Sequence, residues 1–217
     1  MRPWPWKLVT FDIDGTLTRG HGWRFLAERT GQRAAFEATN RRFFAGESDE
    51  NAHLRALLDL AVGRTPAEVL AIVAAGPKIA GIRESVEELH RRGAQVAILS
   101  HNPEFIEAWY QSTYGFDDAE GIQATRLVDG RVAPYPPLNA EKLVWMHRLL
   151  SRRGIPAEGA VHVGDGRADA LVFPHVGGGV ALNSELPDVR AAADLALEAD
   201  DLRSLLPRLA ELSPRRR

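Results

Sequence analysis

The sequence predicts an α/β fold in which a doubly wound, mostly parallel sheet carries a small helical insertion. From Gly81 onward, β-like apolar runs alternate with amphipathic helical segments, and this alternation is typical of parallel sheets. No convincing strand pattern occurs between Leu17 and Gly81, directly after the first strand. We therefore expect residues 1–18 and 79–217 to form the sheet core and residues 19–78 to form a helical cap.

The first part of the chain is expected to form one strand followed by helices. The strand is the apolar run 7–11, which ends at Asp12. The last of the helices begins with Thr65-Pro66-Ala67-Glu68, which is typical of a capped helix start with Pro at the first helical position. The helical segments share apolar residues spaced three or four apart, and they are residues 22–29, 32–44, 48–61 and 65–75.

The remainder of the chain contains further strands, helices and one hairpin signal. Asp129-Gly130 separates the runs 123–128 and 131–135, and this dipeptide favours a two-residue hairpin turn. Short buried strands are expected at residues 94–99, 160–163 and 176–182. Helices are expected at residues 81–92, 103–114, 140–153, 186–193 and 201–212.

Composition narrows the classes of partner. The chain has 217 residues, 45% of them apolar and 26% charged, which suits one core with a small accessory domain. Its net charge of -2 favours neither nucleic acid nor an anionic membrane as a partner. No apolar run approaches the roughly 20 residues that span a bilayer. The chain has no cysteine, which excludes disulfides and thiolate zinc sites and fits the cytoplasmic location that we expect. The oligomeric state stays open.

Polar residues follow three of the expected strands. Asp12, Ser100 and Asp165 each come where a buried run ends, and the carboxyl ends of parallel strands meet at one edge of a sheet. Asp14 lies two residues after Asp12, so one carboxylate of this pair suits a nucleophile and the other a proton donor in phosphoryl chemistry. Asp-x-Asp-Gly is also a common turn composition. The first motif alone therefore leaves both interpretations open.

Four ordered motifs together resemble the haloacid dehalogenase superfamily. They are Asp12-Ile13-Asp14-Gly15-Thr16, Leu99-Ser100, Lys142, and Gly164-Asp165-Gly166-Arg167-Ala168-Asp169. The chain length and the helical insertion directly after the first motif resemble the phosphoserine phosphatase-like branch. The resemblance implies a Rossmann-like core with a helical cap, and a hydrolase that acts on a small-molecule phosphomonoester.

The resemblance also implies catalytic roles. Asp12 corresponds to the nucleophile that forms an aspartyl-phosphate, which divides one slow hydrolysis into two easier steps. Asp14 corresponds to the acid that protonates the leaving oxygen and then takes a proton from water. Lys142 corresponds to the lysine that holds the nucleophile and the phosphoryl group together. It is the sole lysine after the second motif, because Lys7 and Lys78 precede that motif.

A cofactor and a phosphate site are implied in the same way. The family's Mg²⁺ ligands correspond to Asp12, the backbone carbonyl of Asp14, Asp165 and the supporting acid Asp169, and oxygen ligands of this kind suit Mg²⁺. The phosphate group is expected to meet a set of residues from the first two motifs. This set is Thr16, Ser100, His101 and Asn102, of which His101 stands where the family usually has glycine.

The cap residues leave the substrate open. The family's glutamate that receives the ammonium group of phosphoserine falls on His21 here, and an imidazole is a poor ammonium acceptor. Arg55 resembles the cap arginine that pairs with the serine carboxylate. His53 and His101 are further candidate substrate contacts. Phosphoserine is therefore one candidate among several small phosphomonoesters.

Two other functions remain as alternatives. Asp14 argues against dehalogenation, because departure of a halide needs no proton donor. A phosphotransferase of the same superfamily would pass the phosphoryl group to another metabolite instead of water. A phospho-acceptor signalling module would also use a doubly wound sheet and an acidic Mg²⁺ pocket. The expected hairpin, the long cap and Asp14 make the signalling module the weaker alternative.

Overall fold

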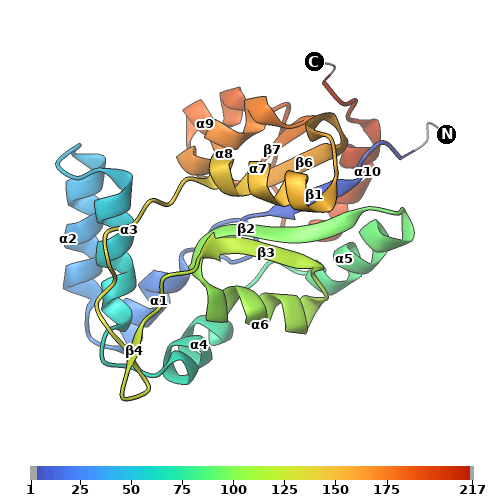
Figure 1. Ribbon diagram of the computed structural model, residues 1–217. Coiled ribbons are helices and arrows are strands. Elements are labelled where there is room, and N and C mark those ends of the chain that lie inside the picture. The colour runs from blue at the N-terminus through green and yellow to red at the C-terminus, as the bar shows by residue number, and fades with distance from the viewer. Residues whose placement is uncertain (1–3, 216–217) are drawn as a thin grey trace.

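The computed structural model describes residues 4–215, and its centre is a six-stranded sheet. The strand order is β3-β2-β1-β6-β7-β8, and every neighbouring pair is parallel, which confirms the predicted fold class. The sheet is flanked by helices (Figure 1). The strands are β1 Leu8–Phe11, β2 Gln95–Pro103, β3 Asp118–Ile122, β6 Ala160–Gly164, β7 Gly178–Leu182 and β8 Leu195–Leu197.

The helices fall into two groups along the chain. Those of the first group follow β1 and lie together to one side of the sheet in Figure 1: α1 Gly22–Arg29, α2 Arg33–Phe44, α3 Glu50–Leu58 and α4 Pro66–Ala75. Those of the second group are interspersed with the later strands: α5 Ile82–Arg91, α6 Glu104–Tyr114, α7 Lys142–Arg153, α8 Arg167–Val172, α9 Pro187–Ala192 and α10 Leu205–Glu211. No helix within residues 4–215 is long and apolar enough to cross a membrane.

Local sequence signals explain where several helices begin and end. The Thr65 hydroxyl and the Glu68 carboxylate form the predicted capping box at the start of α4. Asp49 caps α3 by accepting a hydrogen bond from the backbone N–H of Ala52. Gly154 ends α7 in the left-handed conformation that favours glycine. The central strands β1, β6 and β7 are buried throughout, so the core lies on both faces of the sheet.

Two strands were absent from the sequence-based prediction. β3 has the sequence Asp-Ala-Glu-Gly-Ile, which is rich in poor strand formers, and tertiary contacts stabilise it instead. Glu120 of β3 forms ion pairs with Arg148 and Arg152 of α7. β8 has only three residues and carries little periodic signal. In addition, β2 continues to Pro103 beyond its predicted end at residue 99.

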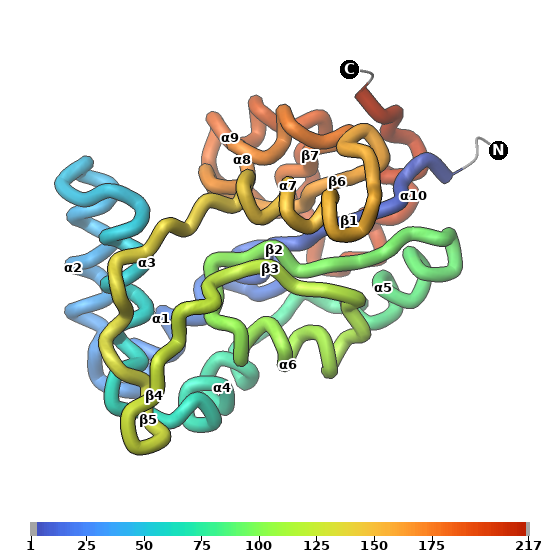
Figure 2. The backbone as a smooth tube through the Cα atoms, viewed as in Figure 1, coloured from blue at the N-terminus to red at the C-terminus, as the bar shows by residue number. Residues whose placement is uncertain are grey.

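The predicted hairpin exists, and it packs on the first helical group. Its strands β4 Leu127–Val128 and β5 Arg131–Val132 are shorter than expected. The backbone N–H of Gly63 donates to the Val132 carbonyl at 2.9 Å, and the Val132 N–H donates to the Arg64 carbonyl at 2.8 Å. Figure 2 shows this segment leaving β3, running along the helices and returning to α7. The division into a sheet core (residues 1–18 and 79–217) and a helical cap (residues 19–78) stays a prediction. The hairpin, which belongs to the core segment, forms these hydrogen bonds with the cap segment.

Gly121 allows β3 to approach its neighbours closely. A Cβ atom at this position would lie 1.7 Å from Glu107 Oε1 and 2.6 Å from the Ser100 carbonyl oxygen. We predict that Gly121→Ala lowers the free energy of unfolding by about 1–3 kcal/mol, as overpacking in a core does. Urea unfolding measures this change. Gly159→Ala is the control, because its Cβ would meet the nearest atom at an ordinary 3.5 Å. Equal stabilities of the two variants would contradict the prediction.

Candidate active site

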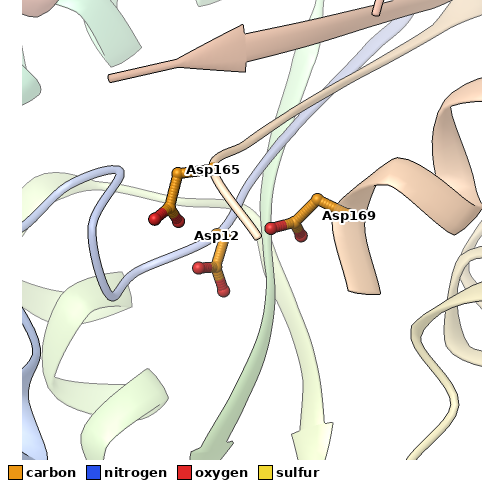
Figure 3. A group of neighbouring side chains, drawn as sticks. All are labelled: Asp12, Asp165 and Asp169. Carbon is orange, nitrogen blue, oxygen red and sulfur yellow. The ribbon is translucent and has the colours of Figure 1, made fainter. Parts of the chain in front are cut away.

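Three carboxylates converge at the carboxyl edge of the sheet. Asp12 directly follows β1, Asp165 directly follows β6, and Asp169 lies in the first turn of α8. The backbone N–H of Asp12 donates to the Val163 carbonyl at 2.9 Å and so continues the contact between β1 and β6. One oxygen from each carboxylate lies within 4.8 Å of the others. Figure 3 shows the three side chains turned toward a common space.

Lys142 lies between two of these carboxylates. Its Nζ atom is 2.7 Å from Asp12 Oδ1 and 2.6 Å from Asp169 Oδ1, and all three side chains are buried. Burial lowers the pKa of Lys142, but the charges of Asp12 and Asp169 outweigh it and leave the pKa raised. Lys142 is therefore an ammonium ion at neutral pH and links the start of α7 to both acids.

Asp169 is held by groups on both of its oxygens. His162 Nε2 lies 2.9 Å from Oδ1, and the Gly166 N–H donates to Oδ2 at 2.9 Å. The other ring nitrogen of His162 contacts the Thr10 hydroxyl at 2.8 Å. Burial raises the pKa of Asp169, but Lys142 and His162 outweigh burial and leave the pKa lowered. The sequence analysis did not select His162, and its position in the strand that leads to Gly164 and Asp165 was the signal that could have identified it.

Asp14 connects the sheet edge to the first helix. Its Oδ1 atom accepts a hydrogen bond from the Gly22 N–H at 2.5 Å, at the start of α1. Its Oδ2 atom accepts from Asn102 Nδ2 at 2.8 Å, and the same amide nitrogen donates to Ser100 Oγ at 3.0 Å. His21 Nδ1 lies 3.8 Å from Asp14 Oδ1. Asp14 is thus oriented by α1 and by β2 together.

The charge balance fits a divalent cation. Burial raises the pKa of Asp12 to about 7 despite Lys142. Burial and the neighbouring Asp12 also raise the pKa of Asp165 well above its ordinary value. Asp165 is further held by the Thr16 hydroxyl, which donates to Oδ1 at 3.3 Å, and by Ser184, which donates to the Asp165 backbone carbonyl at 2.6 Å. Clustered carboxylates that disfavour their own ionisation suit Mg²⁺, whose positive charge would offset theirs.

A cavity of about 260 Å³ extends from the acids to the first helical group. Of the predicted site residues, Asp12, Asp14, His21, Ser100, His101, Lys142, Asp165 and Asp169 line it. His53, a further candidate substrate contact, also lines it. Among the other lining residues are Trp23, Asn40, Phe43, Phe44, Glu50, Leu54 and Leu57. Asn102 and Thr16 are not among the lining residues, but each donates a hydrogen bond to one of them, Asn102 to Asp14 and Thr16 to Asp165. A phosphate contact for either residue stays a prediction.

The structure does not bring Arg55 to this cavity. Arg55 lines a second cavity with Ser48 and Asp59 on another face of α3. Glu50, which the sequence analysis did not select, lies on the face of α3 that lines the main cavity. Residues 50, 54 and 57 follow helical spacing, so the apolar Leu54 and Leu57 were the signal that could have identified Glu50.

Lys142 supplies a test of the buried charge cluster. We predict that Lys142→Met lowers the free energy of unfolding by about 3–5 kcal/mol, because it leaves buried carboxylates without a counter-charge. Urea unfolding in EDTA measures the loss. Lys7→Met is the matched control, since the exposed Lys7 side chain makes no hydrogen bond or ion pair within residues 4–215. We expect Lys7→Met to change the free energy of unfolding by no more than about 0.5 kcal/mol. Equal losses of unfolding free energy in the two variants would contradict the stabilising role of Lys142 between Asp12 and Asp169.

The raised pKa of Asp12 predicts a pH dependence in EDTA. Its pKa rises from an ordinary 3.8 to about 7 in the folded chain. The stability that this difference contributes is therefore fully present below about pH 4 and is lost as the pH rises through about 7. Between these values, the free energy of unfolding falls more steeply in the wild type than in Asp12→Asn. We expect added Mg²⁺ to raise the free energy of unfolding of the wild type at pH 7.5. Parallel pH profiles for the two proteins would contradict the assignment.

Comparison with known proteins identifies the family. The model of the haloacid dehalogenase-like hydrolases matches residues 6–177. A phosphoserine phosphatase of Wolinella succinogenes is 29% identical over 206 residues, which are 94% of this chain and 100% of that protein. This likeness extends along nearly the whole chain.

Solved structures share the fold. A haloacid dehalogenase family hydrolase from Salmonella enterica serovar Typhi has a TM-score of 0.87 at 22% identity, over 96% of this chain and 72% of that one. A phosphoserine phosphatase with an analogue of the phospho-aspartyl intermediate has a TM-score of 0.78 at 24% identity, over 94% of this chain and 98% of that one. The motif order, the parallel sheet and the family match agree, and the chain belongs to the haloacid dehalogenase-like hydrolases.

Proposed function

We propose that this protein is a Mg²⁺-dependent phosphatase that hydrolyses a small phosphomonoester through an aspartyl-phosphate on Asp12. The observation that carries the proposal is the position of the Asp12 carboxylate. It lies at the carboxyl edge of the sheet and lines the cavity, and its Oδ1 atom is 2.7 Å from Lys142 Nζ. The similarity to a phosphoserine phosphatase of Wolinella succinogenes supports the same reaction class.

Asp12 has the geometry of a nucleophile. Oδ1 carries the Lys142 contact, while Oδ2 has no hydrogen bond from any group within residues 4–215. The free oxygen can attack phosphorus, and the bond to the leaving oxygen then breaks. Mg²⁺ held by Asp12, Asp165 and Asp169 would shield these carboxylates from the negative phosphate. Lys142 keeps the nucleophilic carboxylate in place during both steps.

Asp14 suits the proton transfers. Gly22 and Asn102 hold its two oxygens, so the carboxyl group keeps one orientation beside Asp12. In the first step it donates a proton to the leaving oxygen. In the second step it takes a proton from the water that attacks the aspartyl-phosphate. The reaction thus returns both aspartates to their starting states and releases phosphate.

Ser100 suits the phosphoryl oxygens. Its Oγ atom accepts a hydrogen bond from Asn102 Nδ2, which leaves the hydroxyl proton of Ser100 free to donate into the cavity that it lines. Donors aimed at developing negative charge stabilise the transition state. Asn102 therefore orients both the proton donor Asp14 and the phosphate-binding Ser100.

The activity test uses p-nitrophenyl phosphate as an aryl phosphomonoester. We predict Mg²⁺-dependent release of nitrophenol that Asp12→Asn reduces at least about 10³-fold, because the nucleophile is removed. Asp14→Asn reduces it by about 10²–10⁴-fold. The control is Asp129→Asn, an exposed hairpin residue far from the cavity lining. Normal turnover by Asp12→Asn would show that another group attacks phosphorus.

A further inference from the structure

The part of the cavity under the first helical group is lined by polar as well as apolar side chains. Besides apolar side chains from α1 to α3, it carries the polar residues Asn40, Glu50 and His53. His101 lines the same cavity from β2. Which substrate fits this cavity depends on whether these polar groups present hydrogen-bond donors, acceptors or charge.

Glu50 presents an unpaired carboxylate. It is the first residue of α3, is half-buried and lines the cavity. No group within residues 4–215 forms a hydrogen bond or an ion pair with its side chain. Burial raises its pKa, and the charge of Lys142 opposes that rise. A partly buried carboxylate without a partner is costly, and a cationic ligand group would remove the cost.

His53 presents a hydrogen-bond acceptor. Its side chain is 9% exposed and stacks on Phe43 with 4.3 Å between ring centroids. The buried Nδ1 atom has no hydrogen-bond partner within residues 4–215. Burial lowers the pKa of His53. A neutral imidazole has one ring nitrogen that accepts a hydrogen bond, and the unpartnered Nδ1 can supply it.

His101 presents a second acceptor. Its Nε2 atom is buried and has no hydrogen-bond partner within the described chain. Burial, together with the charge of Lys142, lowers its pKa to about 3. The ring is therefore neutral, and the unpartnered Nε2 can supply its one acceptor nitrogen. Trp145 contacts this ring edge-on with 5.5 Å between centroids.

Within residues 4–215, the side chains that line this cavity offer a substrate carboxylate no unpaired cation. The two cavity-lining side chains with a permanent positive charge are Lys142 and Arg167. Lys142 pairs with Asp12 and Asp169, and Arg167 pairs with Asp188 at 2.9 Å. Arg55, the predicted carboxylate partner, lines the other cavity. The cavity is thus rich in acceptors and poor in free positive charge.

We propose that the substrates are phosphate esters of amino alcohols that lack a carboxylate, with the ammonium group paired to Glu50. Ammonium or hydroxyl protons of the leaving group meet His53 Nδ1 and His101 Nε2, and the carbon skeleton packs against Trp23 and Phe43. This inference rests on the proposed phosphatase activity. The reaction stays the same hydrolysis: the amino alcohol departs with the ester oxygen and a proton from Asp14, and water then supplies a hydroxyl group to the phosphate and returns a proton to Asp14.

The first experiment compares two substrates that differ only by the carboxylate. Wild-type protein with Mg²⁺ is assayed on phosphoethanolamine and on phosphoserine by phosphate release. We expect kcat/KM for phosphoethanolamine to exceed that for phosphoserine at least tenfold, because the carboxylate has no cation to meet. Equal or greater kcat/KM for phosphoserine would overturn the inference.

The second experiment tests Glu50 with a matched substrate and a matched variant. In 2-hydroxyethyl phosphate a hydroxyl group replaces the ammonium group. We expect Glu50→Gln to raise KM for phosphoethanolamine at least tenfold and to leave KM for 2-hydroxyethyl phosphate within twofold. Glu47→Gln is the control, because Glu47 is exposed and outside the cavity lining. Equal effects of Glu50→Gln on both substrates would show a structural role and overturn the pairing.

Aryl phosphate hydrolysis separates this inference from the proposed function. If p-nitrophenyl phosphate is hydrolysed through Asp12 while the amine preference is absent, the substrate assignment is wrong and the phosphatase assignment stands. If no phosphomonoester, the aryl one included, is hydrolysed with Mg²⁺ by the folded protein, both are wrong.

Discussion

The ammonium group of Lys142, shared between Asp12 and Asp169, is the interaction on which the site depends. Two buried carboxylates at 2.7 and 2.6 Å from Nζ make this one cation a link between β1, α7 and α8. Its positive charge favours the ionised form of both acids against burial, because unpaired buried charge is strongly destabilising. His162 and the Gly166 N–H then fix Asp169, and the Val163 carbonyl fixes the Asp12 backbone. The Asp12 carboxylate, the proposed nucleophile, is therefore positioned by the same contacts that allow it to be buried.

Sequence patterns predicted the features that depend on local order along the chain. The alternation of strands and helices predicted the parallel sheet, and the residues after β1 and β6 predicted the acidic edge. Features that depend on packing were missed. β3 is held by arginines of α7 despite its poor strand propensity. The sequence also did not indicate which face of α3 lines the main cavity. Glu50 and Arg55 are five residues apart, which is about 140° around a helix. Glu50 therefore lines the main cavity and Arg55 lines the second one.

The acidic site and the rest of the cavity lining come from different parts of the chain. The carboxyl ends of the strands and the first turns of α7 and α8 supply the acids, Lys142 and Ser100, while α1 to α3 supply much of the remaining lining. Asp14 joins the two parts, since Gly22 of α1 and Asn102 of β2 hold its two oxygens. The hairpin at Gly63 and Arg64 is a second link. A family can thus keep one reaction at the sheet edge while residues of the helical wall change, and the proposed pairing of Glu50 with an ammonium group would be one such change.

The covalent state of Asp12 during turnover tests the central claim most directly. Protein mixed with excess p-nitrophenyl phosphate and Mg²⁺ is quenched in acid within milliseconds, reduced with borohydride and digested for peptide mass spectrometry. An aspartyl-phosphate is reduced to homoserine, whereas a free carboxylate is not. The account predicts homoserine at position 12 and unchanged aspartate at positions 14, 165 and 169. Reduction at another aspartate, or unmodified Asp12 in an enzyme that turns over, would contradict it.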